Sequence, residues 1–145
     1  MTSVLPDPDT EFGARVARRL REEKLAWLTV VDPAGRPQPA PVWFLWDPDA
    51  ATALIYSNHA AKRLDHLRAN PHVALHLDGD GRGGDVVVLT GEIAEVPEGP
   101  AVPDNPAYLA KYGSWIEGGP WKTPEVFAET YSVPLRLTVR RIRGH

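Results

Sequence analysis

The chain has 145 residues and a formal net charge of -3, with 16 Lys and Arg side chains against 19 Asp and Glu. This balance argues against a nucleic-acid-binding protein, which normally carries an excess of basic charge. The absence of cysteine excludes disulfide and thiolate chemistry. No apolar run approaches the ~20 residues that a membrane span needs, and the acidic, proline-broken start is unlike a signal peptide. We therefore expect a cytoplasmic protein, with residues 1–145 forming a single domain.

The first predicted element is a helix that begins after Asp9 or Thr10, either of which can cap it. Phe12, Val16 and Leu20 recur every four residues and form one apolar stripe. The rest of the helix is strongly basic, which indicates a solvated face. Its basic residues are Arg15, Arg18, Arg19 and Arg21.

After this helix the pattern predicts about six strands separated by turn residues. Their ranges are Ala26–Val31, Gln38–Trp46, Ala53–Ser57, Val73–Asp78, Asp85–Val96 and Val133–Ile142. The second strand should begin at a sheet edge or a bulge, because Pro39 and Pro41 remove ladder donors, yet it is apolar enough to be buried. Helices are expected after the third strand, at 106–112 and at 124–131, with a linker or an arm over Pro97–Pro106. The fold class is mainly β with short helices, a small antiparallel barrel.

Two patterns that could suggest sites have simpler interpretations. The Gly79–Gly84 stretch lacks the lysine and hydroxyl of a phosphate loop, so we interpret it as a hairpin turn. His72 and His76 share one strand face but have no third ligand at a telling spacing, so no metal is expected. No serine or histidine lies in a nucleophile motif, so any catalysis would depend on a cofactor.

A stronger signal is the pair Lys62 and Arg63 at the start of the short helix after the third strand. Cations at this end oppose the helix dipole, which suggests a compensating anion such as phosphate. Ser57 and Asn58 supply small polar groups beside them. The alternative is that both are ordinary surface charges, and in either case both should be exposed.

Tryptophan is frequent in this chain, which contains five. Trp43 and Trp46 lie three apart on a predicted strand and face opposite sides, so one can lie in the core while the other lines a pocket or an interface. Trp115 and Trp121 fall in the irregular segment 113–122. There they can meet a partner or a flat ligand, or simply cap the core.

The run YSNHAAKRLDHLRANPHVALHLDGDGRGGDVVVLTGE and the tail TPEVFAETYSVPLRLTVRRIRG resemble the pyridoxamine-phosphate-oxidase-like split-barrel superfamily. Within it, they look most like the actinobacterial branch that uses the deazaflavin coenzyme F420. The similarity extends from Leu25 to Gly144. It implies a split antiparallel β-barrel of the FMN-binding type and a homodimer with a flavin-like cofactor at its interface.

The resemblance also implies site residues. The phosphate would lie near Ser57, Lys62 and Arg63, and the strand segment Pro41, Val42 and Trp43 would follow the ring system. No catalytic residue can be assigned. Candidates for a proton donor are Tyr56, Tyr112, Tyr131 and solvent, and candidates for the coenzyme's anionic tail are Lys111, Lys122 and the arginines 136, 140, 141 and 143 of the last strand.

The expected function is that of an F420-dependent reductase. The alternatives are an FMN-dependent oxidoreductase and a non-catalytic flavin- or heme-binding protein. The pyridoxamine oxidase reaction itself is not expected, because its enzymes end in an Arg-Leu-x-Pro motif and this chain ends Arg-Ile-Arg-Gly-His.

Overall fold

The computed structural model describes residues 4–145, which form one seven-stranded antiparallel sheet in the order β2-β1-β5-β6-β7-β4-β3. The strands are β1 (Ala26–Val31), β2 (Pro37–Val42), β3 (Leu45–Asp47), β4 (Thr52–Ser57), β5 (His72–Leu77), β6 (Val87–Glu95) and β7 (Val133–Gly144). The helices are α1 (Glu11–Glu22), α2 (Arg63–Ala69), the 3-10 turn η1 (Val102–Asp104), α3 (Pro106–Gly118) and α4 (Pro124–Thr130).

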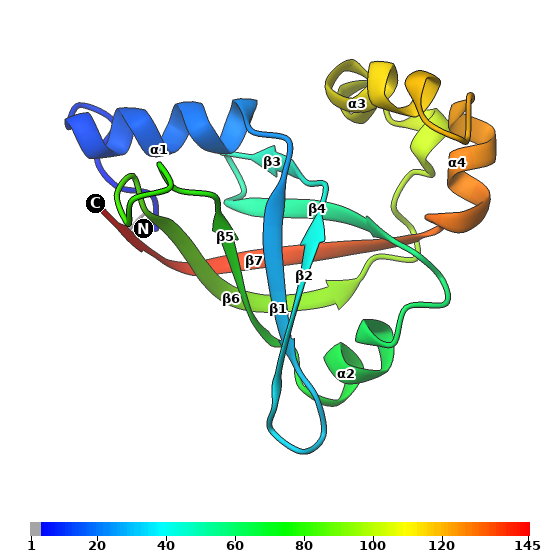
Figure 1. Cartoon of the computed structure of the whole chain (residues 1–145), viewed down its shortest axis with the longest axis horizontal. Coiled ribbons are helices and arrows are strands. Elements are labelled where there is room, and N and C mark those ends of the chain that lie inside the picture. Colours follow the sequence, from blue (N-terminus) through cyan, green and yellow to red (C-terminus); the bar gives the residue numbers. More distant parts are fainter. Residues whose placement is uncertain (1–3) are drawn as a thin grey trace.

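The connection between β2 and β3 explains why the sheet is curled. These strands lie at opposite edges of the sheet, yet only Trp43 and Phe44 separate them in the chain. Two residues span only about 7 Å, so the sheet must curve until its edges approach each other (Figure 1). The result is a half-closed barrel, which confirms the expected split-barrel fold.

A bulge in the long β6–β7 ladder adds to this curvature. The register shifts between Thr90 and Gly91. A Cβ atom on Gly91 would lie 2.0 Å from the carbonyl oxygen of Thr138, so only glycine allows this close approach. Bulges bend and twist a strand pair, as closure of the sheet requires.

The single strand predicted over Gln38–Trp46 is wrong, since it is broken at Trp43 and Phe44. The backbone of Phe44 bonds to side chains of α3 instead of a neighbouring strand. Its N–H donates to the Tyr112 hydroxyl at 2.8 Å, and its carbonyl accepts from Lys111 Nζ at 2.8 Å. The hydrogen bonds that a neighbouring strand would make with Phe44 are therefore made by side chains that lie 67 and 68 positions further along the chain. A local strand pattern cannot reveal such distant partners.

Strand β2 is an edge strand, as its prolines indicate, and Pro39 and Pro41 lie opposite Thr29 and Trp27 of β1. The prediction that Gln38–Trp46 is buried is wrong for its first part, since four of the six residues of β2 are exposed. It is right for Val42, Phe44 and Trp46, which are buried.

The core forms two apolar clusters. The larger one fills the barrel and receives Val16 and Leu20 from α1 and Leu64 and Leu67 from α2. The smaller one lies under α3 and α4. Trp46 belongs to the first cluster and Trp43 packs against the second, so the two tryptophans do face opposite sides.

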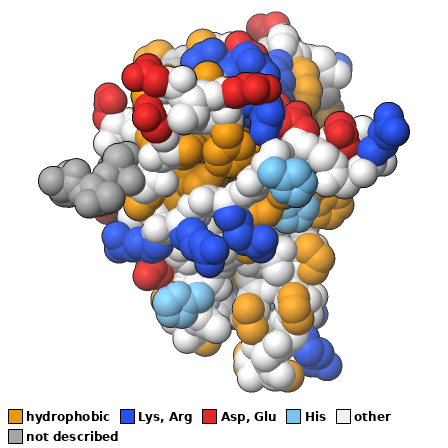
Figure 2. Space-filling view, turned by 90° about the vertical axis from the view of Figure 1, so that its left-hand side faces the viewer, with side chains coloured by type: hydrophobic (Ala, Val, Ile, Leu, Met, Phe, Trp, Pro, Cys, Tyr) orange, Lys and Arg blue, Asp and Glu red, His pale blue; other side chains and the backbone are white. Residues whose placement is uncertain are grey.

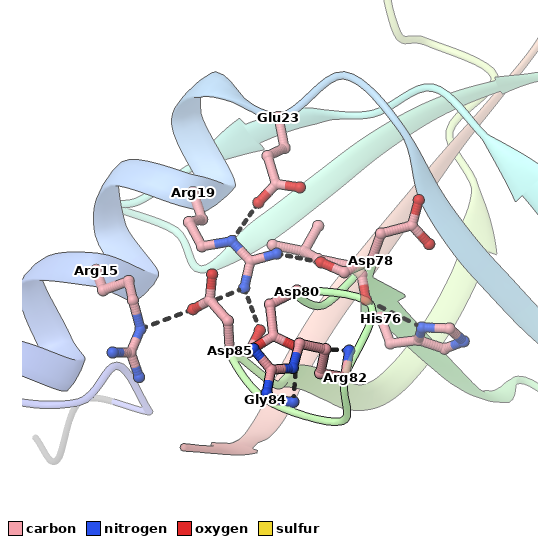
Figure 3. Close-up of polar contacts among 10 residues, drawn as sticks. Arg15, Arg19, Glu23, His76, Asp78, Asp80, Arg82, Gly84 and Asp85 are labelled. Carbon is pink, nitrogen blue, oxygen red and sulfur yellow. Dashed lines mark hydrogen bonds and ion pairs between the residues drawn. The ribbon is translucent and has the colours of Figure 1, made fainter.

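Helix α1 fastens the loop between β5 and β6 (Figure 3). The Arg19 guanidinium is buried and donates to Glu23 and to the backbone carbonyls of Asp78 and Asp85. It also lies 3.1 Å from the Asp85 carboxylate. The expectation that the whole basic face is solvated is therefore wrong for Arg19. The loop itself joins antiparallel strands, so the hairpin interpretation of Gly79–Gly84 is confirmed.

The segment between β6 and β7 is more helical than the sequence suggested. Helix α3 continues to Gly118 instead of ending near residue 112, which places Trp115 on the helix rather than in an irregular stretch. Asn105 caps α3 by accepting from the Tyr108 N–H at 3.2 Å, and Thr123 caps α4. Within residues 4–145, no helix is long and apolar enough to cross a membrane.

Candidate functional site

A cavity of about 460 Å³ opens between the β2–β3 crossing, the start of α2 and the helices α3 and α4. This volume is within the usual range of small-molecule sites. Aromatic rings dominate its wall. The lining residues are Leu25, Pro41, Val42, Trp43, Tyr56, Asn58, Ala60, Ala61, Arg63, Tyr108, Trp121, Phe127 and Tyr131.

The aromatic wall is a continuous stack. Trp43 stacks on Tyr112 and on Phe127, with ring centroids 4.8 and 5.4 Å away and nearly parallel planes. Phe127 stacks in turn on Tyr131 at 4.5 Å. Trp121 meets Phe127 edge-on at 5.0 Å. Much of the Trp43 ring face is therefore occupied by protein rings, which leaves less of it for a bound ligand.

Arg63 supplies the positive charge in the wall of the cavity. Its side chain is half-buried, which corrects the expectation that it is exposed. Burial lowers the pKa of the guanidinium, and the smaller effect of the nearby Tyr131 phenol opposes this. No residue in the described part of the chain forms an ion pair or side-chain hydrogen bond with Arg63. A half-buried cation without a counter-ion favours an anionic ligand.

Lys62 faces an adjoining cavity of about 240 Å³ that shares Ala61 and Arg63 with the first. This second cavity is lined by edge-strand residues, and also by Lys62 and His66. Lys62 is exposed. No carboxylate of residues 4–145 lines either cavity. The boundary between the two cavities is therefore cationic on both sides.

Of the other predicted site residues, some line the larger cavity and one does not. Pro41, Val42 and Trp43 line the larger cavity together with Arg63. Ser57 does not line it: its side chain is fully buried and its hydroxyl donates to the carbonyl of Asn58 at 3.1 Å. Asn58, its neighbour, takes the place in the wall.

The tyrosines named as proton donors have different surroundings. The Tyr56 hydroxyl donates to the Pro100 carbonyl at 2.7 Å and accepts from the Asn105 amide at 3.1 Å. The Tyr112 hydroxyl accepts a hydrogen bond from the N–H of Phe44 at 2.8 Å. Tyr131 lines the cavity without a hydrogen bond from its hydroxyl to any described residue.

Sequence reasoning missed Tyr108 and Phe127 as cavity residues, whereas Trp121 lines the cavity, as its interpretation as a flat-ligand contact allowed. A signal for Tyr108 was present, because Tyr108 and Tyr112 lie four apart and therefore share one face of a helix. The predicted helix 106–112 included both residues, but the pattern alone does not say which cavity that face covers.

The arginines proposed for an anionic tail lie elsewhere. Arg136, Arg140, Arg141 and Arg143 are exposed on β7, and none lines either cavity. Arg140 is paired with Glu92 at 2.8 Å. The end of the molecule opposite α3 and α4 shows basic side chains in a band (Figure 2).

Lys111, also proposed for the anionic tail, donates a hydrogen bond to the Phe44 carbonyl, and burial lowers its pKa to about 8.

Potential metal ligands do not gather in this structure. His72 and His76 share a face of β5, as expected from their spacing. Among residues 4–145, no group of three or more histidine or acidic side chains is arranged to hold an ion.

Comparison with known proteins identifies a family. The sequence model of the family described as pyridoxamine 5'-phosphate oxidase matches residues 12–144. In a search of the curated proteins, nothing matches the chain.

Several solved structures share the fold. A Listeria innocua protein provisionally assigned as a pyridoxamine 5'-phosphate oxidase is 18% identical, with a TM-score of 0.66 over 90% of this chain and 94% of that one. An F420 reductase is 22% identical, with a TM-score of 0.61 over 85% and 90%. A FAD-binding protein from Mesorhizobium loti is 22% identical, with a TM-score of 0.59 over 87% and 88%. At these identities the likeness concerns the fold alone.

Proposed function

Because the chain belongs to the pyridoxamine 5'-phosphate oxidase family, we propose that its aromatic cavity binds a flavin-like cofactor, coenzyme F420, and that the protein is an F420-dependent reductase. When bound, reduced F420 supplies a hydride to an electron-poor small molecule. The protein's own contribution is to bind the coenzyme, orient it against the substrate and exclude water.

Arg63 is the observation that carries this proposal. It places an uncompensated guanidinium in a wall that contains no described carboxylate. A phosphate group would replace the water that this cation loses on burial and would form charge-assisted hydrogen bonds with it. The rest of the wall is aromatic and apolar, which suits a flat ring system and keeps water away from it.

Lys62 favours F420 over FMN. Beyond Arg63, the cationic surface continues into the adjoining cavity, where Lys62 and His66 lie and no described carboxylate does. F420 carries a carboxylate-bearing tail beyond its phosphate, whereas FMN ends at the phosphate. The carboxylates of the F420 tail can therefore lie in this adjoining cavity, beside Lys62. An F420 reductase is among the proteins that share the fold, which agrees with this choice.

The test begins with the absorbance of the purified protein. A colourless protein that quenches F420 fluorescence on titration supports the proposal, a yellow flavin spectrum supports FMN, and a Soret band supports heme. Reductase activity is then measured by mixing the protein with reduced F420 and a quinone and following the return of F420 fluorescence. Absence of F420 binding at micromolar concentrations would rule the proposal out.

A matched pair of variants locates the binding. Arg63→Gln should weaken F420 binding by about 10- to 100-fold, the range expected for lost hydrogen bonds to a charged group. Arg143→Gln makes the same chemical change at an exposed position of β7 and should leave affinity unchanged. Equal affinities of the two variants would show that the anion binds elsewhere.

A further inference from the structure

Tyr108 is a buried tyrosine whose ring position is fixed from several sides. The residue is 1% exposed. Its N–H is held by the cap residue Asn105 at the start of α3. Its ring meets Tyr56 edge-on at 4.8 Å and lies 4.9 Å from that of Tyr112. The side chain therefore has little freedom to turn its hydroxyl elsewhere.

The Tyr108 hydroxyl nevertheless has no hydrogen-bond partner among residues 4–145. Its two tyrosine neighbours differ, since the hydroxyls of Tyr56 and Tyr112 are both bonded to backbone carbonyls. The described side-chain polar atoms that are fully enclosed and form no hydrogen bond belong to Arg15, His66 and Asp85, and of these Arg15 and Asp85 form an ion pair at 2.9 Å. The Tyr108 hydroxyl is not one of them, so it retains an opening, and the cavity beside Tyr108 is the aromatic one that also contains Arg63.

An unpaired hydroxyl in a buried position is costly, because it loses its bonds to water without replacement. Burial, with smaller effects from Tyr112, Tyr56 and Tyr131, raises the pKa of this phenol. The group is therefore protonated at neutral pH and is available as a hydrogen-bond donor. A donor that is rigidly held and unsatisfied in the free protein is prepared for an acceptor on a ligand.

We propose that the Tyr108 hydroxyl donates a hydrogen bond to a carbonyl oxygen on the ring system of the cofactor whose phosphate is held by Arg63. This inference rests on the proposed function and adds a polar contact to its aromatic site. It restricts the ligand to flat molecules that combine an anionic group with a ring acceptor. Both F420 and FMN meet this requirement, because their rings carry carbonyl groups.

Tyr108→Phe tests the inference because it removes the hydroxyl and keeps the ring. The expected affinity for F420, measured by fluorescence titration, is about five- to tenfold lower, as for one lost hydrogen bond. The denaturant midpoint of the free protein should be unchanged or higher, since no protein partner is lost. Tyr56→Phe is the matched control in the same wall. It breaks bonds to Pro100 and Asn105 and should lower the midpoint.

The outcomes separate the two proposals. If the parent binds F420 or FMN and Tyr108→Phe binds it equally well, the inference is wrong and the proposed cofactor site stands. A lower midpoint for Tyr108→Phe would also overturn the inference, because it would reveal a structural partner for the hydroxyl. If the parent binds neither probe, the proposed function and the inference fail together.

Discussion

The hydroxyl of Tyr112 accepts a hydrogen bond at 2.8 Å from the N–H of Phe44, at the point where the chain crosses from one sheet edge to the other. Its own proton is shared between the carbonyls of Lys24, at 2.8 Å, and Phe44, at 2.9 Å. One phenol thus joins α3 to the end of α1 and to the β2–β3 crossing. The Tyr112 hydroxyl thus holds α3 over the cavity and also satisfies the backbone of Phe44, which has no partner strand.

Tyr112→Phe should therefore destabilise the protein. The buried N–H of Phe44 would lose its partner, at a cost of about 1–3 kcal/mol. Chemical denaturation measures this change. Tyr131→Phe is the control, because the Tyr131 hydroxyl bonds to no described residue, and its unfolding free energy should stay close to that of the parent. Similar losses in both variants would contradict the role given to Tyr112.

Removal of the Arg19 side-chain charge should loosen the β5–β6 loop. Arg19→Met would leave the carbonyls of Asp78 and Asp85 without this donor. The Asp85 carboxylate would keep only its ion pair with Arg15, at 2.9 Å. We expect a loss of about 2–4 kcal/mol, a little less than for a fully buried ion pair that loses one member, because Glu23 and Asp85 are partly exposed. Trypsin should also cleave after Arg82 faster. Arg18→Met changes an exposed arginine of the same helix and should alter stability by less than about 0.5 kcal/mol.

The pH dependence of the unfolding free energy should reveal the lowered pKa of Lys111. Burial lowers its pKa from 10.5 to about 8, and nearby Lys24 adds to this effect while Glu23 opposes it. Above pH 8 the unfolded chain therefore binds more protons at this group than the folded chain, so its contribution to stability rises with pH. The raised pKa values of Tyr108 and Tyr112 give the opposite trend only above pH ~10.

Denaturation of parent and Lys111→Met between pH ~8 and ~10 measures this contribution. The parent should gain stability relative to the variant across that window. Lys62→Met, which changes an exposed lysine, should follow the parent. Parallel curves for the parent and Lys111→Met would show that this lysine titrates normally.

Binding of F420 should be tighter than that of FMN, and the difference should shrink as salt rises. Lys62 is exposed, and exposed charge pairs are screened over about 10 Å at 0.1 M ionic strength. Titration of both cofactors at low and high salt measures the effect, and Lys62→Gln should reduce the preference even at low salt. Tighter FMN binding, or a preference that salt does not change, would count against a tail site at Lys62.

We also predict a homodimer. Among residues 4–145, three large apolar side chains are exposed, Leu25 by 37%, Trp115 by 42% and Val126 by 43%, and Leu25 borders the cavity. Contiguous exposed apolar surface marks interaction sites, and we expect a second copy of the chain to cover these side chains. Light scattering at micromolar concentration should give twice the 16.0 kDa of one chain. A monomeric mass would refute the prediction, and Trp115→Ser should shift the equilibrium toward monomer.

The sequence predicted the fold through local patterns and a family resemblance. It located β1, β4, β5 and the cap at Thr123, because strand alternation and capping depend on near neighbours. It did not reveal the break at Phe44, which depends on Tyr112, 68 positions away. Arg19 and Arg63 were misjudged for the same reason: a basic residue on a helix looks solvated until the loops and cavities that surround it are known.

The prolines of β2 affect how molecules of this protein can meet. The N–H of Asp32 bonds to the carbonyl of Arg36, and bonded pairs alternate along an antiparallel ladder. The backbone nitrogens and carbonyl groups of Pro37, Pro39 and Pro41 therefore point away from β1. The open side of β2 offers carbonyl acceptors but lacks an N–H at each of these positions, so a strand from another molecule cannot extend the sheet there. Copies of the chain that meet at this edge must associate through side chains, and this edge resists fibril-like growth.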